Sequence, residues 1–367
     1  MIDHTAVDTL FAHPADRPYA DLVSEVVSSI DPSATCRLLL VDHAARHLRS
    51  LDDGRSFPIE GLLLDVLLDG ERRDIGPSTW LPVKNGAHVE AMLEVRSVQA
   101  GRIPEIETLA SVIGAHMTIV RDHIDTFERL RRRENMSVSA ELQWSLLPTQ
   151  TIESEHWRMS GSLEPAYDIA GDAFDHSLRE DGFTATILDS MGHGDQAVLA
   201  AALALSSFRN AHRHGLSLQE SFRLANRQMR QQFGGARYVT AFGISVVGDR
   251  AEVISAGHPL PWMLRPGGPE RLTVPASLPL GLDELAEYPV TVLDELLDGI
   301  LMITDGVTTA RPDGGDAFGA GRVTELVGSA HWLEPRRLVR RLVEEAVLHR
   351  RGDIEDDICV YAAIRRR

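Results

Sequence analysis

Four aspartates in the second half of the sequence stand where they could do chemistry together. Asp189 and Asp305 each follow an apolar run directly, and Asp172 and Asp356 stand in short polar segments beside other apolar runs. Carboxylates brought close to one another repel unless cations neutralise them, and oxygen ligands suit Mg²⁺ or Mn²⁺. Two such ions can activate a bridging water for displacement at phosphorus. One Asp-Gly pair after a strand is ordinary turn chemistry, so a site requires the four residues to converge.

The elements expected to position these acids follow Pro148. Many strands and few helices are predicted there, which indicates a layered α+β sandwich and not a parallel doubly wound sheet. Helical apolar spacing occurs at 197–213, 217–232 and 335–348. Strands are predicted between Gly, Pro and Asp turns, at 183–188, 239–247, 251–255, 261–264, 290–293, 299–304 and 358–364.

Five motifs occur in a fixed order from residue 170 onwards. They are Ala170-Gly171-Asp172-Ala173-Phe174-Asp175, Asp189-Ser190-Met191-Gly192-His193-Gly194, Ser255-Ala256-Gly257-His258-Pro259, Thr304-Asp305-Gly306 and Asp356-Asp357. In this order they resemble the motifs of SpoIIE/RsbU-type phosphatases of the protein phosphatase 2C (PPM) superfamily. The stretch Leu142-Gln143-Trp144-Ser145-Leu146-Leu147-Pro148 is similar to the lead-in helix of that family. The resemblance therefore covers roughly residues 138–367 and implies an α-β-β-α sandwich for the domain at 149–367.

The resemblance also implies roles for individual residues. Two Mn²⁺ or Mg²⁺ ions would be held by Asp172, Asp189, Asp305 and Asp356 together with the backbone carbonyl of Ser190. The same four acids and His193 would form the catalytic set. Asp175 and Asp357 would lie behind the ligands or on the substrate side.

Two histidines and two threonines leave alternatives open. An imidazole titrates near neutral pH, so His193 or His258 could protonate the leaving serine oxygen, while His258 could instead shape a hairpin. The family commonly carries an acid shortly after the Asp305-Gly306 pair, where this chain has Thr308 and Thr309. An incomplete metal site with low activity is the corresponding alternative.

The first 103 residues are expected to form a smaller α/β domain. Residues 19–30 have helical apolar spacing and end at Asp31-Pro32-Ser33. Short apolar runs at 36–41, 62–68, 79–83 and 88–95 predict an antiparallel sheet. The order of these elements is similar to that of a GAF-type sensor domain. A dimerising module without a ligand is the alternative.

Residues 104–148 are expected to form a long linker helix or a pair of helices, because no proline stands between Pro104 and Pro148. A heptad spacing there is typical of a parallel dimeric coiled coil, although the same face could pack within its own domain. The repeating residues are Leu109, Ile113, His116, Val120, His123, Phe127 and Leu130. A homodimer through this helix would carry a signal from the first domain to the turn at Asp189.

Composition excludes several classes of protein. With 43% hydrophobic and 25% charged residues in 367 positions, the chain is typical of a globular protein with two domains. A formal charge of -17 argues against nucleic acid as the partner. No membrane span is expected, because no apolar run approaches roughly 20 residues. Cys36 and Cys359 make no disulfide framework or metal motif, which favours the cytoplasm.

These features predict a metal-dependent protein serine/threonine phosphatase that hydrolyses phosphoserine or phosphothreonine through a metal-bridged water. By the resemblance, its substrate would be a phosphorylated anti-sigma-factor antagonist of the STAS type in a sigma-factor switch. The alternative hypothesis is a degenerate phosphatase fold that binds a phosphoprotein without turnover.

Overall fold

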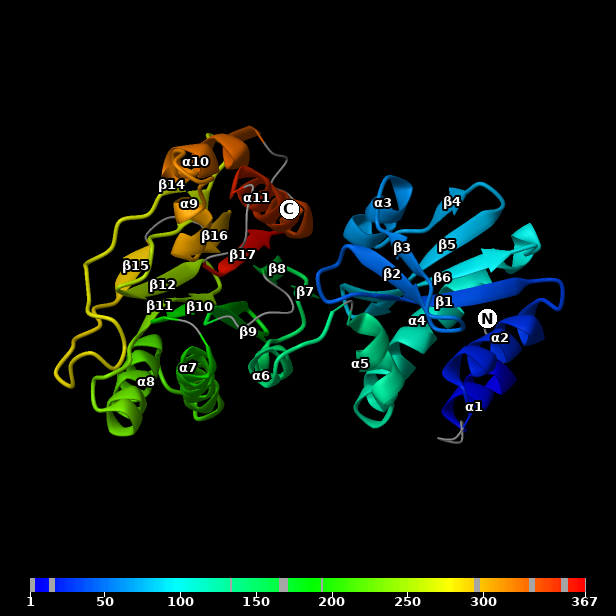
Figure 1. The fold of residues 1–367 in the computed structure, drawn as a ribbon, viewed down its shortest axis with the longest axis horizontal. Coiled ribbons are helices and arrows are strands. Elements are labelled where there is room, and N and C mark those ends of the chain that lie inside the picture. The colour runs from blue at the N-terminus through cyan, green and yellow to red at the C-terminus, as the bar shows by residue number, and fades with distance from the viewer. Residues whose placement is uncertain are drawn as a thin grey trace. The chain divides into compact units, whose positions relative to one another are not determined.

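A computed structural model describes residues 4–12, 17–132, 134–164, 171–192, 194–293, 298–329, 334–350 and 356–366. The chain forms two compact units, Met1–Asn135 and Met136–Arg367. Figure 1 shows the elements of each unit along the colour gradient. In the part of the chain that the structure describes, no helix is both long and apolar enough to cross a membrane.

The first unit is built on a six-stranded antiparallel sheet with the strand order β3-β2-β1-β6-β5-β4. Its strands are β1 (Thr35–Val41), β2 (His47–Ser50), β3 (Ser56–Pro58), β4 (Arg73–Ile75), β5 (Ser78–Asn85) and β6 (His88–Arg96). Its helices are α1 (His4–Phe11), α2 (Tyr19–Ile30), α3 (Leu62–Asp69), η1 (Ala100–Arg102), α4 (Ile103–Val120), η2 (Arg121–His123) and α5 (Asp125–Arg131).

The two faces of this sheet bury separate cores. Along β1, Leu38 and Leu40 pack with residues of α1, α2, α4 and α5, whereas Leu39 and Val41 pack with residues of α3. This alternation follows from the two-residue period of a strand, which points successive side chains to opposite faces. Helix α3 therefore lies on one face, and helices α1, α2, α4 and α5 lie on the opposite face, as Figure 1 shows.

The prediction of a strand at 62–68 is wrong, because these residues form helix α3. The run Leu62-Leu63-Leu64-Asp65-Val66-Leu67-Leu68 is apolar at almost every position, so it has no period that would distinguish a strand from a buried helix. Leucine has a high helix propensity. Gly70, with a φ of 64°, ends the helix in the left-handed conformation typical of a C-cap.

The prediction of a long linker helix over 104–148 is also wrong. The described part of this segment is divided among α4, η2, α5 and a further α-helix, Val138–Leu146, and Ile124 is extended, with φ -126° and ψ 91°, between η2 and α5. Leu109, Ile113 and Phe127 are at most 1% exposed in the core of the first unit. His116 accepts or donates a 2.9 Å hydrogen bond with the hydroxyl of Tyr19. The heptad face therefore packs within its own unit, which contradicts a dimeric coiled coil through these residues.

The second unit contains two antiparallel sheets with the strand orders β15-β12-β11-β10-β9 and β14-β13-β16-β17-β8-β7. The first sheet consists of β9 (Ala173–Arg179), β10 (Gly182–Ser190), β11 (Val239–Val247), β12 (Arg250–Ala256) and β15 (Thr291–Leu293). The second consists of β7 (Thr151–Glu153), β8 (Trp157–Glu164), β13 (Trp262–Leu264), β14 (Glu270–Arg271), β16 (Gly299–Ile303) and β17 (Ile358–Arg365). The helices are α6 (Val138–Leu146), α7 (Asp195–Arg213), α8 (Leu218–Phe233), α9 (Asp305–Thr309), α10 (Gly319–Ser329) and α11 (Pro335–Arg350).

These elements form four layers, as the sequence predicts. Phe174, Phe183, Phe242 and Tyr361 belong to a core between the two sheets. A second core lies between the β9–β15 sheet and the pair α7 and α8, and a third lies between the other sheet and α9, α10 and α11. Figure 1 shows the two helical layers on the outer faces of the sheets. A sandwich of this kind has two ends at which loops from both sheets meet.

Candidate metal centre

Aspartates from both sheets meet at one end of the sandwich. Asp189 is the penultimate residue of β10, and Asp172 directly precedes β9 in the same sheet. Asp305 begins α9 with one residue, Thr304, between it and the end of β16, and Asp356 and Asp357 directly precede β17 in the other sheet. Each acid thus stands at the end of a buried strand, which fixes the position of its backbone.

Close backbone contacts hold these strand ends together. The amide of Gly171 donates a hydrogen bond to Oδ2 of Asp357, and a Cβ atom on Gly171 would lie 3.0 Å from the carbonyl oxygen of Ser190. A Cβ atom on Gly306 would lie 1.7 Å from the carbonyl oxygen of Asp357, so only glycine fits there. The segments that carry Asp172, Ser190, Asp305 and Asp357 therefore touch one another.

The carboxyl groups influence one another strongly. Burial, then the charges of Asp305, Asp356 and Asp357, raise the pKa of Asp189 to about 7. Burial and the charge of Asp189 are the largest causes that raise the pKa of Asp172 well above its usual range, and this residue is 3% exposed. Burial and Asp356 raise the pKa of Asp305. Such shifts mark negative charges that lack enough compensating positive charge, and a divalent cation would supply it.

The donor set fits a hard divalent cation in its chemistry, since it consists of carboxylate oxygens and nearby backbone carbonyls. The carboxylates do not surround a single ion position. In the described ranges, no three His, Cys, Asp or Glu side chains are arranged as ligands of one ion. The mutual effect on pKa nevertheless requires the charges to be near neighbours. The suitability of the acidic end for a divalent cation therefore rests on two features. The strand ends converge there, and the charges of their acids affect one another.

His258 does not face this acidic end as a free acid or base. Its Nδ1 lies 2.8 Å from Oγ1 of Thr240, and its Nε2 lies 3.1 Å from the carbonyl oxygen of Ile303. Both ring nitrogens are therefore engaged, and burial lowers the pKa of His258 to about 3. The ring links β11 to the end of β16, which favours a structural role of His258 over the general-acid role. His193 lies outside the described residues.

Helix α6 contacts the acidic end through Gln143 and contacts helix α7 at two further points. The side-chain amide of Gln143 donates a 2.5 Å hydrogen bond to the carbonyl of Asp172. The hydroxyl of Ser139 donates to the carboxylate of Asp195, the first residue of α7. Arg209 of α7 donates a 2.6 Å bond to the carbonyl of Leu146. The sequence places Gln143 only within a lead-in helix and does not reveal this contact.

Asp175, expected behind the ligands or on the substrate side, pairs with Arg209 and is 6% exposed. Nε and Nη2 of Arg209 donate to its two carboxylate oxygens at 3.0 and 2.8 Å. After Asp305, the hydroxyls of Thr308 and Thr309 donate to the carbonyl of Asp305 at 3.1 and 2.8 Å. These threonines therefore serve the short helix α9 and add no carboxylate to the acidic end.

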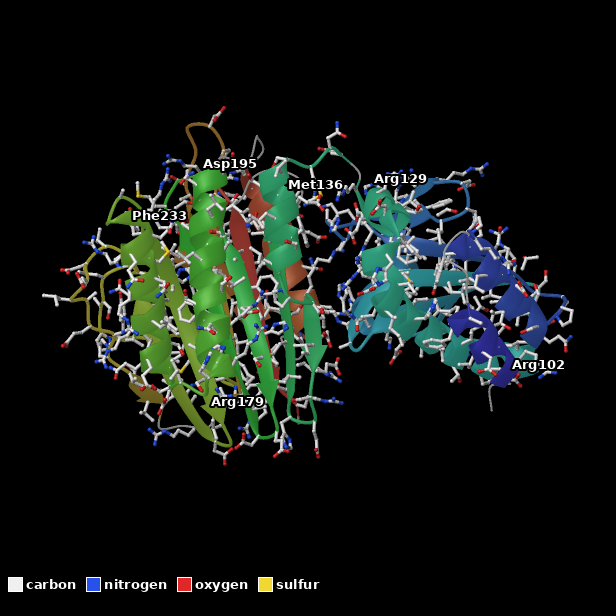
Figure 2. The ribbon with its side chains drawn as sticks, turned by 90° about the horizontal axis from the view of Figure 1, so that it is seen from below. Arg102, Arg129, Met136, Arg179, Asp195 and Phe233 are labelled. Atoms are coloured by element: carbon white, nitrogen blue, oxygen red, sulfur yellow. The ribbon has the colours of Figure 1, made fainter. Side chains whose placement is uncertain are left out.

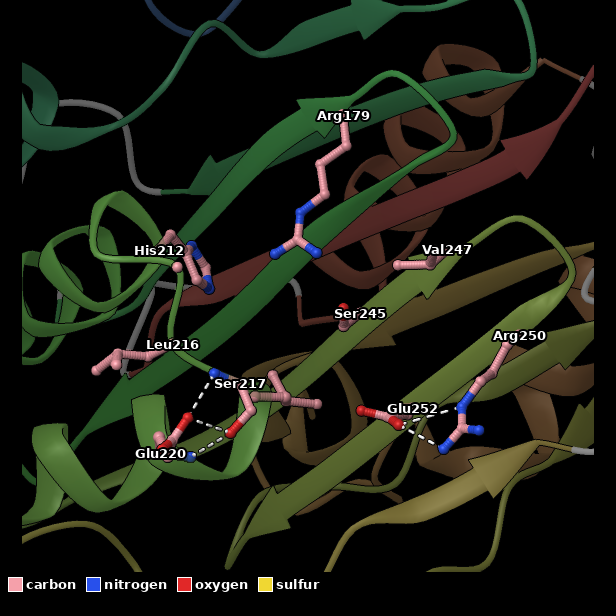
Figure 3. Close-up of a pocket in the computed structure, with 11 residues that line it drawn as sticks. Arg179, His212, Leu216, Ser217, Glu220, Ser245, Val247, Arg250 and Glu252 are labelled. Carbon is pink, nitrogen blue, oxygen red and sulfur yellow. Dashed lines mark hydrogen bonds and ion pairs between the residues drawn. The ribbon is translucent and has the colours of Figure 1, made fainter.

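A separate cavity of about 580 Å³ lies at the other end of the β9–β15 sheet. Arg179, His212, Ser217, Arg250 and Glu252 are among its lining residues, and Figure 3 shows them around the end of β11. Figure 2 shows Arg179 and Asp195 at opposite ends of the sandwich. Two of its charged groups are already satisfied, because Glu252 pairs with Arg250 and Glu220 caps α8. This cavity shares no residue with the acidic end.

The arrangement of the second unit defines a class of protein. It shares its fold with the PP2C domain of SiaA from Pseudomonas aeruginosa, at a TM-score of 0.52 and 17% identity over 62% of this chain and 94% of that one. A structure of the phosphatase domain of SpoIIE from Bacillus subtilis matches at a TM-score of 0.47 and 18% identity, over 58% of this chain and 64% of that one. The likeness to the SiaA domain gives the fold class of the second unit, which is the four-layer PP2C fold.

Residues 179–366 match the family described as Stage II sporulation protein E (SpoIIE), which is just over half of the chain. This protein therefore belongs to the SpoIIE family. It is also 25% identical over 187 residues to the phosphoserine phosphatase RsbP of Bacillus subtilis, a match over 49% of this chain and 46% of that protein. The chain thus spans about half the length of this curated relative.

Proposed function

We propose that this protein is a Mn²⁺- or Mg²⁺-dependent phosphatase of phosphoserine or phosphothreonine in proteins. The observation that supports this most is the group of acids at one end of the sandwich, in which Asp189 has a pKa of about 7. Carboxyl groups that raise one another's pKa are suited to bind cations. Membership of the SpoIIE family and the relative named as a phosphoserine phosphatase support the same activity.

The residues that would hold two cations are Asp172, Asp189, Asp305 and Asp356, with the carbonyl of Ser190. When bound, such ions supply the positive charge that lowers the pKa of water and neutralises phosphoryl oxygens. The chain itself contributes the fixed positions of its acids: Gly306 lets the strand ends approach, and His258 holds the carbonyl of Ile303 two residues before Asp305. Preorganised charge of this kind stabilises the transition state without further rearrangement.

The substrate is proposed to be a phosphorylated anti-sigma-factor antagonist of the STAS type. This rests on the family and on the relative RsbP. The protein's charge of -17 is compatible with a folded protein substrate and argues against a nucleic acid.

The test is hydrolysis of p-nitrophenyl phosphate with Mn²⁺ or with a chelator. We expect activity to require the metal and to fall by at least about 100-fold in Asp189→Ala, more than for residues that only support a ligand. Asp313→Ala is the matched control, because Asp313 is an exposed acid in a turn between α9 and α10. A metal-independent rate, or equal rates for Asp189→Ala and the wild type, would refute the proposal.

The alternative is a degenerate phosphatase fold that binds a phosphoprotein without turnover. Thr308 and Thr309, which stand where the family commonly has an acid, favour this alternative, as does the incomplete closure of the acids. Replacing Thr308 by Asp separates the two. A large gain in metal-dependent hydrolysis over an inactive wild type would support the degenerate site, whereas an active wild type would exclude it.

The first unit is proposed to be a GAF-like sensor that regulates the phosphatase unit. Its antiparallel sheet with helices on both faces is compatible with this, and a dimerising module without a ligand is the alternative. The contact of Gln143 with Asp172, together with that of Ser139 with the first residue of α7, supports α6 as the route to the acidic end. A chain limited to residues 136–367 should differ from the full chain in rate or Mn²⁺ dependence. Identical kinetics would argue against regulation.

A further inference from the structure

Thr304 stands at the N-cap position of α9, directly before Asp305, and is completely buried. A threonine at this position usually accepts a hydrogen bond from a backbone amide in the first turn of its helix. Here the side chain makes no such cap. The hydroxyl therefore does not make the capping hydrogen bond within α9 that its position favours.

This hydroxyl connects the two sheets at the acidic end. It donates a 2.6 Å hydrogen bond to Oδ2 of Asp172, which precedes β9, and accepts a 2.9 Å bond from the amide of Cys359 in β17. The amide of Thr304 donates in turn to the carbonyl of Cys359 at 3.0 Å. Thr304 is thus anchored on its own sheet by Cys359 and reaches across to an acid of the other sheet.

The single hydroxyl proton has two possible acceptors. The carbonyl oxygen of Cys359 lies 3.5 Å from Oγ1 of Thr304, whereas Oδ2 of Asp172 lies at 2.6 Å. A distance of 3.5 Å is beyond the usual range for an O–H donor, whereas 2.6 Å is within it. The hydroxyl of Thr304 therefore donates its proton to Oδ2 of Asp172. The other carboxylate oxygen, Oδ1, does not take part in this hydrogen bond.

We propose that Thr304 is a positioning residue of the metal centre, which fixes one oxygen of Asp172 through its hydroxyl and so orients the other toward a cation. This inference rests on the proposed metal-dependent function. Groups behind a metal ligand commonly set the orientation of that ligand, and their loss weakens metal binding. The backbone of Asp172 is held separately by Gln143, so Thr304 acts on the carboxylate itself.

The test is Mn²⁺ binding to the full chain, measured by isothermal titration calorimetry and by the loss of the free-ion signal in electron paramagnetic resonance. Thr304→Val keeps the volume and removes the hydroxyl, and we expect its Mn²⁺ affinity to fall about 10-fold. Thr304→Ser keeps the hydroxyl and should bind within about twofold of the wild type. Thr184→Val is the matched control: Thr184 is a buried threonine of β10, 2% exposed and five residues before Asp189.

A second comparison separates positioning from a general loss of structure. In an Asp172→Ala background, Thr304→Val should cause no further loss of Mn²⁺ affinity, because the carboxylate that it positions is gone. An equal loss in both backgrounds would overturn the inference. If Thr304→Val does not fold, Thr304→Cys replaces it, because a thiol is a weak donor. Equal Mn²⁺ affinities of Thr304→Cys and Thr304→Ser would then overturn the inference.

The two proposals fail in different ways. Wild-type protein that binds no Mn²⁺, or binds it as well after Asp189→Ala, would refute the metal-dependent function and with it the role of Thr304. Wild-type protein that binds Mn²⁺ through Asp172 and Asp189, with unchanged binding in Thr304→Val, would refute the role of Thr304 alone.

Discussion

Among single residues, Asp189 should make the stability of the folded chain depend on pH. Its pKa is about 7 in the folded chain, against an ordinary value of 3.8 for an aspartate in an unfolded chain. Between these values the folded state binds more protons than the unfolded state, so stability falls as pH rises through this window and is constant above it. In a chelator, we expect Asp189→Asn to be more stable than the wild type at pH 8, by about 2–4 kcal/mol.

The measurement is urea unfolding at pH 4.5, 6, 7 and 8 with a chelator present. The difference between Asp189→Asn and the wild type should grow with pH up to about 7. Asp313→Asn, at an exposed turn, is the control and should give a difference that does not change with pH. Parallel curves for Asp189→Asn and the wild type would show that the carboxylate is compensated by other groups.

His258 should make the stability of the folded chain change with pH in the opposite direction. Burial lowers its pKa from 6.5 to about 3, so the folded state excludes a proton that the unfolded state binds. This contribution to stability is complete above about pH 6.5 and is lost as pH falls toward 3. His258→Phe removes two hydrogen bonds and should cost about 1–3 kcal/mol at pH 7, with a smaller loss on acidification than in the wild type.

The pH profile of hydrolysis distinguishes this structural role from general-acid catalysis. His258→Phe should keep the shape of the wild-type profile between pH 6 and 8, because the ring does not titrate there. If the fall of activity at high pH disappears in this variant, His258 would instead be assigned as the general acid.

At the scale of elements, the pair Arg209 and Asp175 fastens α7 to β9 and to the end of α6. Arg209→Met leaves Asp175, whose side chain is 8% exposed, without its described partner, and should destabilise the protein by about 2–4 kcal/mol. The double variant Arg209→Met with Asp175→Leu should recover much of this loss, because no unpaired buried charge remains. Urea unfolding of both variants measures the difference. Equal stability of the single and double variants would contradict the argument.

Elements with a clear apolar period and a distinct stop are those that the sequence predicts best. Residues 239–247 form β11 and 19–30 form α2 with the predicted bounds, since both have a clear apolar period and a distinct stop. Residues 62–68 and 104–148 are predicted wrongly for opposite reasons. The first run has no period, and the second has a period whose apolar face is buried within its own unit.

The candidate site is predictable only in part for a related reason. Each acid can be assigned to a strand end from the residues around it, but the contact of Thr304 with Asp172 joins positions 132 residues apart. Likewise, Gln143 and Arg209 look like ordinary polar residues of two helices until the fold brings them to Asp172 and Asp175. Contacts of this range depend on the packing of the layers and leave no local pattern in the sequence.

At the scale of the whole molecule, the chain should behave as two units with separate cores. The boundary falls between Asn135 and Met136, so α4 and α5 belong to the first unit and α6 to the second. We expect trypsin to cleave first in the segment from Arg131 to Val138, where the sequence has three consecutive arginines that begin with the last residue of α5. Exposed connections between compact units are the preferred sites of such cleavage.

The two fragments should keep their helical and β-sheet circular dichroism after separation, because each unit retains its own buried core. A fragment that begins at residue 106 would keep most of α4 and α5 without the sheet on which they pack, and should be less stable than one that begins at residue 136. Unfolding of both fragments by urea measures this. A first cut by trypsin within either unit would contradict this boundary. If the fragment from residue 136 unfolds once released, the second unit depends on the first for its stability, and regulation through α6 would act on folding as well as on the acidic end.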